Sequence, residues 1–144
     1  MSTRPERLLL DTNALIFLAN GGLSAPAMEL VVAAGMRRGV LISPVSAWEI
    51  GMLSRAGAEG GPRLRFNPDP QTWFAALQSR PIFAEAPFTA AIAIAAAFLP
   101  GAFHKDPADR LLVATSRAMD VPIMTRDRQI LAYGEAGHVQ AIAC

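Results

Sequence analysis

Short apolar runs alternate with helix-like segments along the whole chain, and this alternation limits the possible folds more than any other feature. The apolar runs carry β-branched and leucine residues, and the segments between them show helical spacing or helix-capping residues. Strands are expected at residues 7–11, 40–43, 81–88, 122–125 and 139–143. Helices are expected at residues 12–19, 24–38, 44–55, 71–80, 89–99 and 107–119, with a short one from 127. Such alternation predicts an α/β fold with a mostly parallel sheet.

The chain length fits one domain. A sequence of 144 residues with 52% hydrophobic content can fill a single core, so we expect one domain over residues 1–144. The Gly- and Pro-rich stretch Ala56–Pro70 is expected to be a surface loop or short hairpin inside that domain. A sheet of four to five strands with helices on both faces would place ligands outside the carboxyl ends of the strands.

Composition excludes several classes of protein. The only cysteine is Cys144, which rules out an internal disulfide and a cysteine-rich zinc cage. The longest apolar run, Ala90–Leu99, has ten residues, whereas a membrane-spanning helix needs about 20. The formal net charge of +1 does not by itself indicate a nucleic-acid binder. We expect a cytoplasmic protein whose function must be read from its site.

Four acidic residues stand where expected strands end or helices begin. Asp11 closes the first strand, Glu49 lies one turn into the helix after the second, Asp109 begins a helix, and Asp127 follows the strand that ends at Thr125. These acids can converge at one edge of the sheet. Two like charges 4 Å apart repel by ~1 kcal/mol in water and ~4 kcal/mol at an effective dielectric of 20. A converged set therefore calls for cations or shared protons.

The expected ligand atoms are carboxylate oxygens. Neither histidine has ligand spacing to another His or Cys, so His104 and His138 are expected to be structural. An all-oxygen set suits Mg²⁺ or Mn²⁺ and disfavours zinc. Mg²⁺ usually binds one or two carboxylates together with a substrate phosphate. The matching reaction is phosphodiester hydrolysis by metal-activated water.

Each acid also has a purely structural interpretation. Asp106-Pro107-Ala108-Asp109 resembles a helix capping box, and Asp11 and Asp127 could cap the helices that follow them. Glu49 could form a buried salt bridge. The joint pattern, more than any single acid, favours a metal site.

Basic and aromatic residues leave further alternatives. Four basic residues border the acids and are either candidate RNA contacts or solvated surface charge: Lys105, Arg110, Arg126 and Arg128. Four aromatic residues share helical spacing with other apolar residues: Trp48, Trp73, Phe74 and Phe98. That spacing predicts core packing for them, and no aromatic platform for RNA bases.

Three segments together resemble the PIN-domain family, and most closely its VapC toxins. They are LLLDTNALI, SPVSAWEIGML and HKDPADRLLVATSRAMDVPIMTRDRQILAYG, which cover nearly the whole chain. The resemblance implies a three-layer sandwich, Mg²⁺- or Mn²⁺-dependent endoribonuclease activity, a VapB-type antitoxin partner, and a homodimer or a complex with the antitoxin. It also implies site residues: Asp11, Glu49, Asp109 and Asp127 as catalytic metal ligands, with Asn13, Asp106 and Thr125 in support.

Two other functions remain open at this point. A hydrophobic strand ending in Asp11 is also the nucleophile site of haloacid-dehalogenase-like phosphatases, although Asn13 stands where their second acid would be. A PIN-fold module that binds without turnover is the non-enzymatic alternative. For the ribonuclease, the loop Ala56–Pro70 is the candidate segment for substrate choice.

Overall fold

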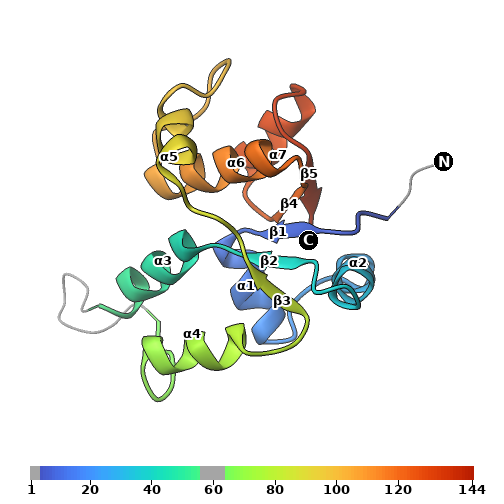
Figure 1. Ribbon diagram of the computed structural model, residues 1–144, viewed down its shortest axis with the longest axis vertical. Helices are drawn as coiled ribbons and strands as arrows, with labels where there is room; N and C mark the ends of the chain where they lie inside the picture. The colour runs from blue at the N-terminus through green and yellow to red at the C-terminus, as the bar shows by residue number, and fades with distance from the viewer. Residues whose placement is uncertain (1–3, 56–63) are drawn as a thin grey trace.

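Five parallel strands form one sheet at the centre of the molecule (Figure 1). In this computed structural model, residues 4–55 and 64–144 are described. The strands are β1 (Leu8–Leu10), β2 (Val40–Ile42), β3 (Phe83–Glu85), β4 (Ile123–Thr125) and β5 (Ala141–Ala143). Their order is β3-β2-β1-β4-β5, and every neighbouring pair is parallel. The expected α/β architecture is confirmed.

Helices cover both faces of the sheet. They are α1 (Thr12–Ala19), α2 (Ala25–Gly35), α3 (Pro44–Ser54), α4 (Pro70–Gln78), α5 (Ala90–Ala97), α6 (Pro107–Met119) and α7 (Arg128–Glu135). Figure 1 shows α5, α6 and α7 on one side of the sheet and α1, α2 and α4 on the other. Helix α3 contacts α1, α4 and α6, so it joins the two helical layers. Within the described ranges, no helix is long and apolar enough to cross a membrane.

The two faces of the sheet bury separate apolar clusters. Successive side chains of a strand point to opposite faces, and β1 follows this rule: Leu9 packs with Leu112 of α6, whereas Leu8 and Leu10 pack with Leu15 of α1. All three residues of β1 have no solvent exposure. Fully burying one leucine side chain contributes about 1.5–3 kcal/mol. The central strand is thereby fixed in register, together with the acid that follows it.

Capping residues set where the helices begin and explain small shifts from the expected boundaries. The Ser43 hydroxyl accepts a 3.0 Å hydrogen bond from the Val45 amide, so Ser43 caps α3 and is not the last residue of β2. The hydroxyl of Thr89 accepts from the Ile92 amide in the same way and starts α5 one residue later. Only residues 83–85 of the expected strand 81–88 are paired in the sheet.

Part of the stretch Ala56–Pro70 lies outside the described residues, namely 56–63. In the described part, Phe66 is buried and its ring packs edge-on against Trp73, with 4.8 Å between centroids. Trp73 and Phe74 pack against the cluster beneath the sheet, as expected for core residues. The hypothesis that this loop selects the RNA therefore concerns mostly residues that are not described here.

Candidate metal centre at the strand ends

Asp11 is a buried carboxylate held by the first amide of α1 and by the end of the neighbouring strand β4. It follows β1, has 3% exposure, and caps α1 by accepting a 2.7 Å hydrogen bond from the Thr12 amide at Oδ1. Its Oδ2 accepts a 2.7 Å hydrogen bond from the hydroxyl of Thr125, the last residue of β4. The two residues meet because β1 and β4 pair in parallel and end at the same edge. The capping interpretation of Asp11 is correct, and it coexists with a place in the acidic site.

Asp106 and Asp127 both cap helices. Oδ1 of Asp106 accepts from the Asp109 amide at 2.9 Å, which confirms the capping predicted for this turn. Oδ1 of Asp127 accepts from the amides of Gln129 and Ile130 at 2.8 and 3.0 Å. An ionised carboxylate has about four acceptor positions, so each cap keeps the capacity to bind a cation.

Glu49 is half-buried on α3 and faces the acids from the adjoining helix. Its Oε1 accepts a short hydrogen bond from the Thr12 hydroxyl, which also lies 2.8 Å from the hydroxyl of Ser46. Within the described ranges, no Lys or Arg nitrogen lies within 4.0 Å of this carboxylate. A buried salt bridge is therefore not what holds Glu49 in place there.

His104 joins the acids, and the expectation of a cluster without histidine is wrong. Its Nε2 lies 3.0 Å from Oδ2 of Asp109, and His104, Asp109 and Asp127 each offer a ligand atom within 4.8 Å of the others. The loop before α6 brings it there because the Arg110 guanidinium donates to the carbonyls of Phe103 and His104. Spacing along the sequence could not predict this contact, since it depends on how the loop folds back.

Burial and mutual repulsion raise the pKa values of three acids. Burial, followed by the charges of Asp11, Asp106, Asp127 and Glu49, raises the pKa of Asp109 to about 8. Burial also raises the pKa of Asp11 and of Glu49. Hydrogen bonds oppose this rise: the Thr125 hydroxyl and the Thr12 amide donate to Asp11, and the Thr12 hydroxyl donates to Glu49. We call Asp11, Glu49, Asp109 and Asp127 the acidic site. Near neutral pH, a bound cation would stabilise the ionised forms of these acids.

The donors fit a divalent metal ion. Within the described chain, His104 Nε2 is the one buried side-chain nitrogen or oxygen without a well-aligned hydrogen-bond partner. Asp109 and Asp127 present carboxylate oxygens beside it. Mg²⁺ and Mn²⁺ favour the carboxylates, whereas imidazole also suits zinc and other transition metals. The all-oxygen argument against zinc therefore no longer holds at this site.

Two of the four basic candidates are held by backbone carbonyls. Arg110 donates to the carbonyls of Ala96 and Ala97 at 2.9 and 3.4 Å, in addition to those of residues 103 and 104. Arg126 donates to the carbonyls of Gly22 and Cys144, and its guanidinium lies 3.8 Å above the ring centre of Phe17. Both arginines thus have structural contacts.

The remaining candidates lie in the open. Lys105 and Arg128 are exposed, so they remain the better candidates for phosphate contacts. Asn13 is exposed on the first turn of α1, two residues after Asp11.

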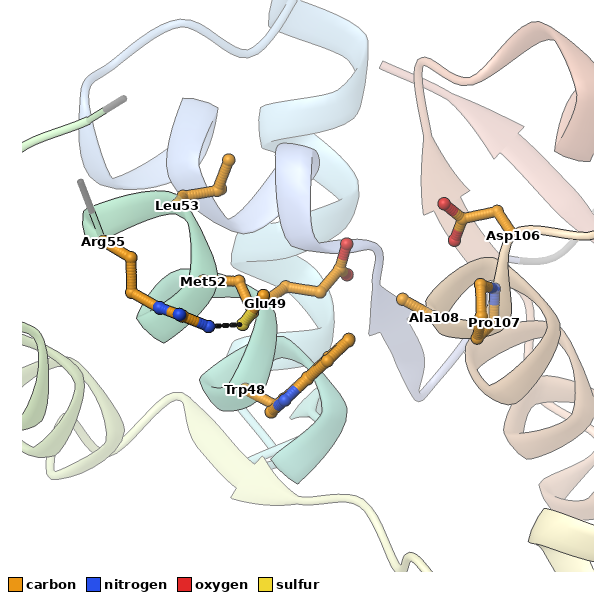
Figure 2. Close-up of a pocket in the computed structure, with 8 residues that line it drawn as sticks. All are labelled: Trp48, Glu49, Met52, Leu53, Arg55, Asp106, Pro107 and Ala108. Atoms are coloured by element: carbon orange, nitrogen blue, oxygen red, sulfur yellow. Dashed lines mark hydrogen bonds between the residues drawn. The ribbon is translucent and has the colours of Figure 1, made fainter. Parts of the chain in front are cut away.

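A cavity of about 430 Å³ opens beside the acidic site (Figure 2). Helix α3 contributes Glu49 and Trp48, and the start of α6 contributes Asp106 and Pro107 across from them. Trp48 is 56% exposed on this rim, so the core packing expected for it is wrong, as it is for Phe98, which is 80% exposed. Helical spacing identifies the face of a helix but not whether a neighbour covers that face.

The sequence matches one family model, and the fold matches solved structures. The model is that of the PIN domain, and it covers residues 8–136. A search of curated protein sequences finds no match.

The solved structures are toxin–antitoxin assemblies with distant sequences. VapBC2 from Rickettsia felis, bound to a DNA fragment from its promoter, aligns with a TM-score of 0.65 at 13% identity, covering 94% of this chain and 97% of that one. FitAB bound to an IR36 DNA fragment gives 0.59 at 20% identity, with 94% of each chain covered. FitAcB from Neisseria gonorrhoeae gives 0.56 at 16% identity, with 94% and 96% covered. These similarities establish a shared fold.

Proposed function

We propose that this chain, which belongs to the PIN domain family, is a Mg²⁺- or Mn²⁺-dependent endoribonuclease and the toxin of a VapBC-type toxin–antitoxin pair. Membership of the family supports a nuclease activity and removes the haloacid-dehalogenase-like alternative. The observation that carries the proposal is the convergence of ligand atoms at the strand ends, where His104, Asp109 and Asp127 each offer one within 4.8 Å of the others. Burial and the surrounding acids also raise the pKa of Asp109 to about 8. A site that resists ionisation in this way gains most from a cation, and a phosphodiester brings further negative charge that the same cation neutralises.

The chain's own residues would hold and orient the ion. Asp11 and Asp109 are the proposed core ligands, while Glu49 and Asp127 complete the site directly or through water. Thr125 fixes the rotamer of Asp11 through its 2.7 Å hydrogen bond. When bound, a divalent ion supplies hydroxide-like water near neutral pH and stabilises charge on the phosphate.

His104 and Thr12 position two of the acids. Nε2 of His104 lies 3.0 Å from Oδ2 of Asp109, close enough to steer that carboxylate or to bind the same ion. The Thr12 hydroxyl donates to Glu49, and it also contacts Ser46. A carboxylate that is already hydrogen-bonded to another helix loses less conformational entropy when it binds a ligand.

The partner proposed for this chain is a VapB-type antitoxin. The solved structures with this fold carry the names of toxin–antitoxin pairs, VapBC2 and FitAB. An arginine from such a partner would be attracted to the acidic site, because a guanidinium offers paired donors to carboxylates. We also propose a homodimer, alone or within the antitoxin complex.

Cleavage of a defined RNA pool tests the proposal. The purified protein, separated from any partner, is assayed with Mn²⁺ or Mg²⁺ and with EDTA, next to Asp11→Asn. Asp120→Asn is the matched control, because Asp120 is exposed at the far end of α6. We expect metal-dependent cleavage that Asp11→Asn loses and Asp120→Asn keeps. Folded protein that binds metal but cleaves no RNA would favour the non-catalytic PIN-fold module.

A further inference from the structure

Trp48 stands exposed between two cavities, directly beside the acidic site. It precedes Glu49 on α3 and is 56% exposed, an unusual position for the largest apolar side chain. It lines the cavity of about 430 Å³ that Glu49 and Asp106 also line. It also lines a second cavity of about 580 Å³, and Pro107 is shared by both. The two cavities therefore meet at the indole ring.

The second cavity is largely apolar. Besides Trp48 and Pro107 it is lined by Pro44, Val45, Glu85, Phe88 and Leu111, of which only Glu85 carries a charge. Phe88 is 41% exposed, so a second aromatic ring is also open to solvent there. We call this cavity the apolar groove. Its lining suits a flat, weakly polar group better than a charged one.

The first cavity, unlike the apolar groove, is lined by several charged side chains. Figure 2 shows the Glu49 carboxylate and the Trp48 ring extending from α3 toward the segment that carries Asp106 and Pro107. The Arg55 guanidinium lies on the same cavity, and it donates to the Met52 sulfur at 3.6 Å. Carboxylates for a metal ion, a cation for a phosphate, and an open aromatic face thus line the same cavity.

We propose that Trp48 stacks on an unpaired RNA base, in a nucleotide next to the phosphate held at the acidic site. This inference rests on the proposed function and adds a residue that would contact the substrate beside the bound phosphate. The faces of bases inside a duplex are covered by their neighbours, so only an unpaired base can lie on the ring. The occupant is a nucleotide because the apolar groove shares Trp48 and Pro107 with the adjoining cavity, which is lined by the carboxylates of Glu49 and Asp106 and by the Arg55 guanidinium. An apolar side chain of a protein partner is the competing occupant.

Intrinsic fluorescence gives a direct readout of stacking. The chain has two tryptophans, and Trp73 is packed against Phe66, so Trp73→Phe leaves Trp48 as the only reporter. Asp109→Asn is added to prevent turnover during titration. The probes are an eight-nucleotide oligoadenylate, an eight-nucleotide oligouridylate, and an RNA duplex of the same length. We expect the single strands to quench Trp48 fluorescence and the duplex to leave it unchanged.

Binding by variants separates stacking from general attraction. Base–aromatic stacking corresponds to roughly a five- to hundredfold change in affinity for one base, so Trp48→Ala should weaken oligoadenylate binding about tenfold. Trp48→Phe keeps a flat ring and should lose less than about threefold. Phe98→Ala is the control, since Phe98 is even more exposed but follows the last residue of α5 and does not line the groove. Its affinity should equal that of the parent protein.

The outcomes distinguish this inference from the nuclease proposal. Quenching by single strands together with the loss in Trp48→Ala supports stacking, even if the parent protein cleaves no RNA, in which case the nuclease proposal alone fails. Metal-dependent cleavage with no quenching and with equal RNA affinity for Trp48→Ala would overturn stacking alone. That second result would assign the apolar groove to a protein partner.

Discussion

The Thr125 hydroxyl donates a 2.7 Å hydrogen bond to Oδ2 of Asp11, and the same oxygen atom of Thr125 accepts one from the Asp127 amide at 2.9 Å. One buried hydroxyl thus links the first residue of the acidic site to the last one. Both strand ends are fully inside the protein, so water cannot replace this contact without a rearrangement.

Removing that hydroxyl should weaken metal binding. Thr125→Val keeps the branched shape but leaves Oδ2 of Asp11 and the Asp127 amide without their partner. Loss of such an orienting contact typically costs 10- to 100-fold in metal affinity or activity, and we expect a drop of about that size. Calorimetric titration with Mn²⁺ and the cleavage rate measure it. Thr125→Ser restores the donor and should recover most of both; a Val variant with unaltered Mn²⁺ affinity would contradict the assignment.

Neutralising Asp109 should separate stability from function. Its pKa is raised to about 8 by burial and by neighbouring acids, so Asp109→Asn removes a charge that the metal-free fold disfavours. We expect the Tm of the metal-free variant at pH 8–9 to rise by a few degrees, while metal-dependent cleavage falls by about 100-fold or more. Asp120→Asn, on the same helix, should change neither quantity. A Tm that falls in Asp109→Asn would show that the carboxylate stabilises the fold.

The stability of the metal-free protein should decrease as the pH rises. The pKa values of Asp11, Glu49 and Asp109 are all raised in the folded state, so folding favours their protonated forms. This contribution is complete below the unfolded pKa values, near 4, and is lost as the pH passes the folded ones, about 8 for Asp109. Scanning calorimetry in EDTA should show a falling Tm from pH 6 to pH 9, and Mn²⁺ should flatten that fall. A Tm that rises across this range in EDTA would refute the electrostatic account.

His104 should contribute to the choice of metal. Its imidazole lies beside Asp109 and Asp127, and nitrogen ligands favour Mn²⁺ or zinc over Mg²⁺. We expect His104→Ala to reduce Mn²⁺ affinity about tenfold and Mg²⁺ affinity less, as measured by calorimetric titration. The other histidine is the control: His138 packs on Tyr133 outside the acidic site, and His138→Ala should keep the ratio of the two affinities. An equal loss for both ions in His104→Ala would leave the histidine with only a positioning role.

Two basic residues should respond differently to substitution. Arg110 donates to four backbone carbonyls, so Arg110→Ala should destabilise the fold by about 1–3 kcal/mol, measured by urea unfolding. Arg128 is exposed, and Arg128→Ala should leave stability unchanged but reduce the salt dependence of RNA binding by about one unit of slope. If Arg110→Ala altered the salt slope with no loss of stability, Arg110 would be the RNA contact instead.

Local sequence patterns predicted the site residues that lie where the parallel strands end. Asp11 and Asp127 were predicted to meet because each follows a short apolar strand and parallel strands end at one edge of the sheet, whereas Thr125 was named only through the family resemblance. Their capping roles follow from the same local geometry, so capping and metal binding were never exclusive. The α/β class and nearly all helices and strands were predicted from the alternation of short apolar runs with segments of helical spacing.

The missed features depend on how the folded chain packs, which the pattern within one segment does not show. His104 reaches the acids because Arg110 holds its loop through carbonyls, and a carbonyl network leaves no trace in residue spacing. Trp48 was expected in the core because its helical face is apolar, but the described part of the chain leaves it 56% exposed. Periodicity describes a segment, whereas exposure is a property of the packed molecule.

The position of β1 in the middle of the sheet also has a consequence for protein synthesis. The ribosome completes its neighbours β2 and β4 at different times. The hydrogen bond between Asp11 and Thr125 can form only after Thr125, 114 positions later in the chain, has been synthesised. At synthesis rates of roughly 5–20 residues per second, this delay is about 6 to 23 s. Until β4 is inserted, the growing chain contains the first acids but not the assembled acidic site. The order of the strands thus leaves the acidic site incomplete until β4 has been synthesised and has paired with β1.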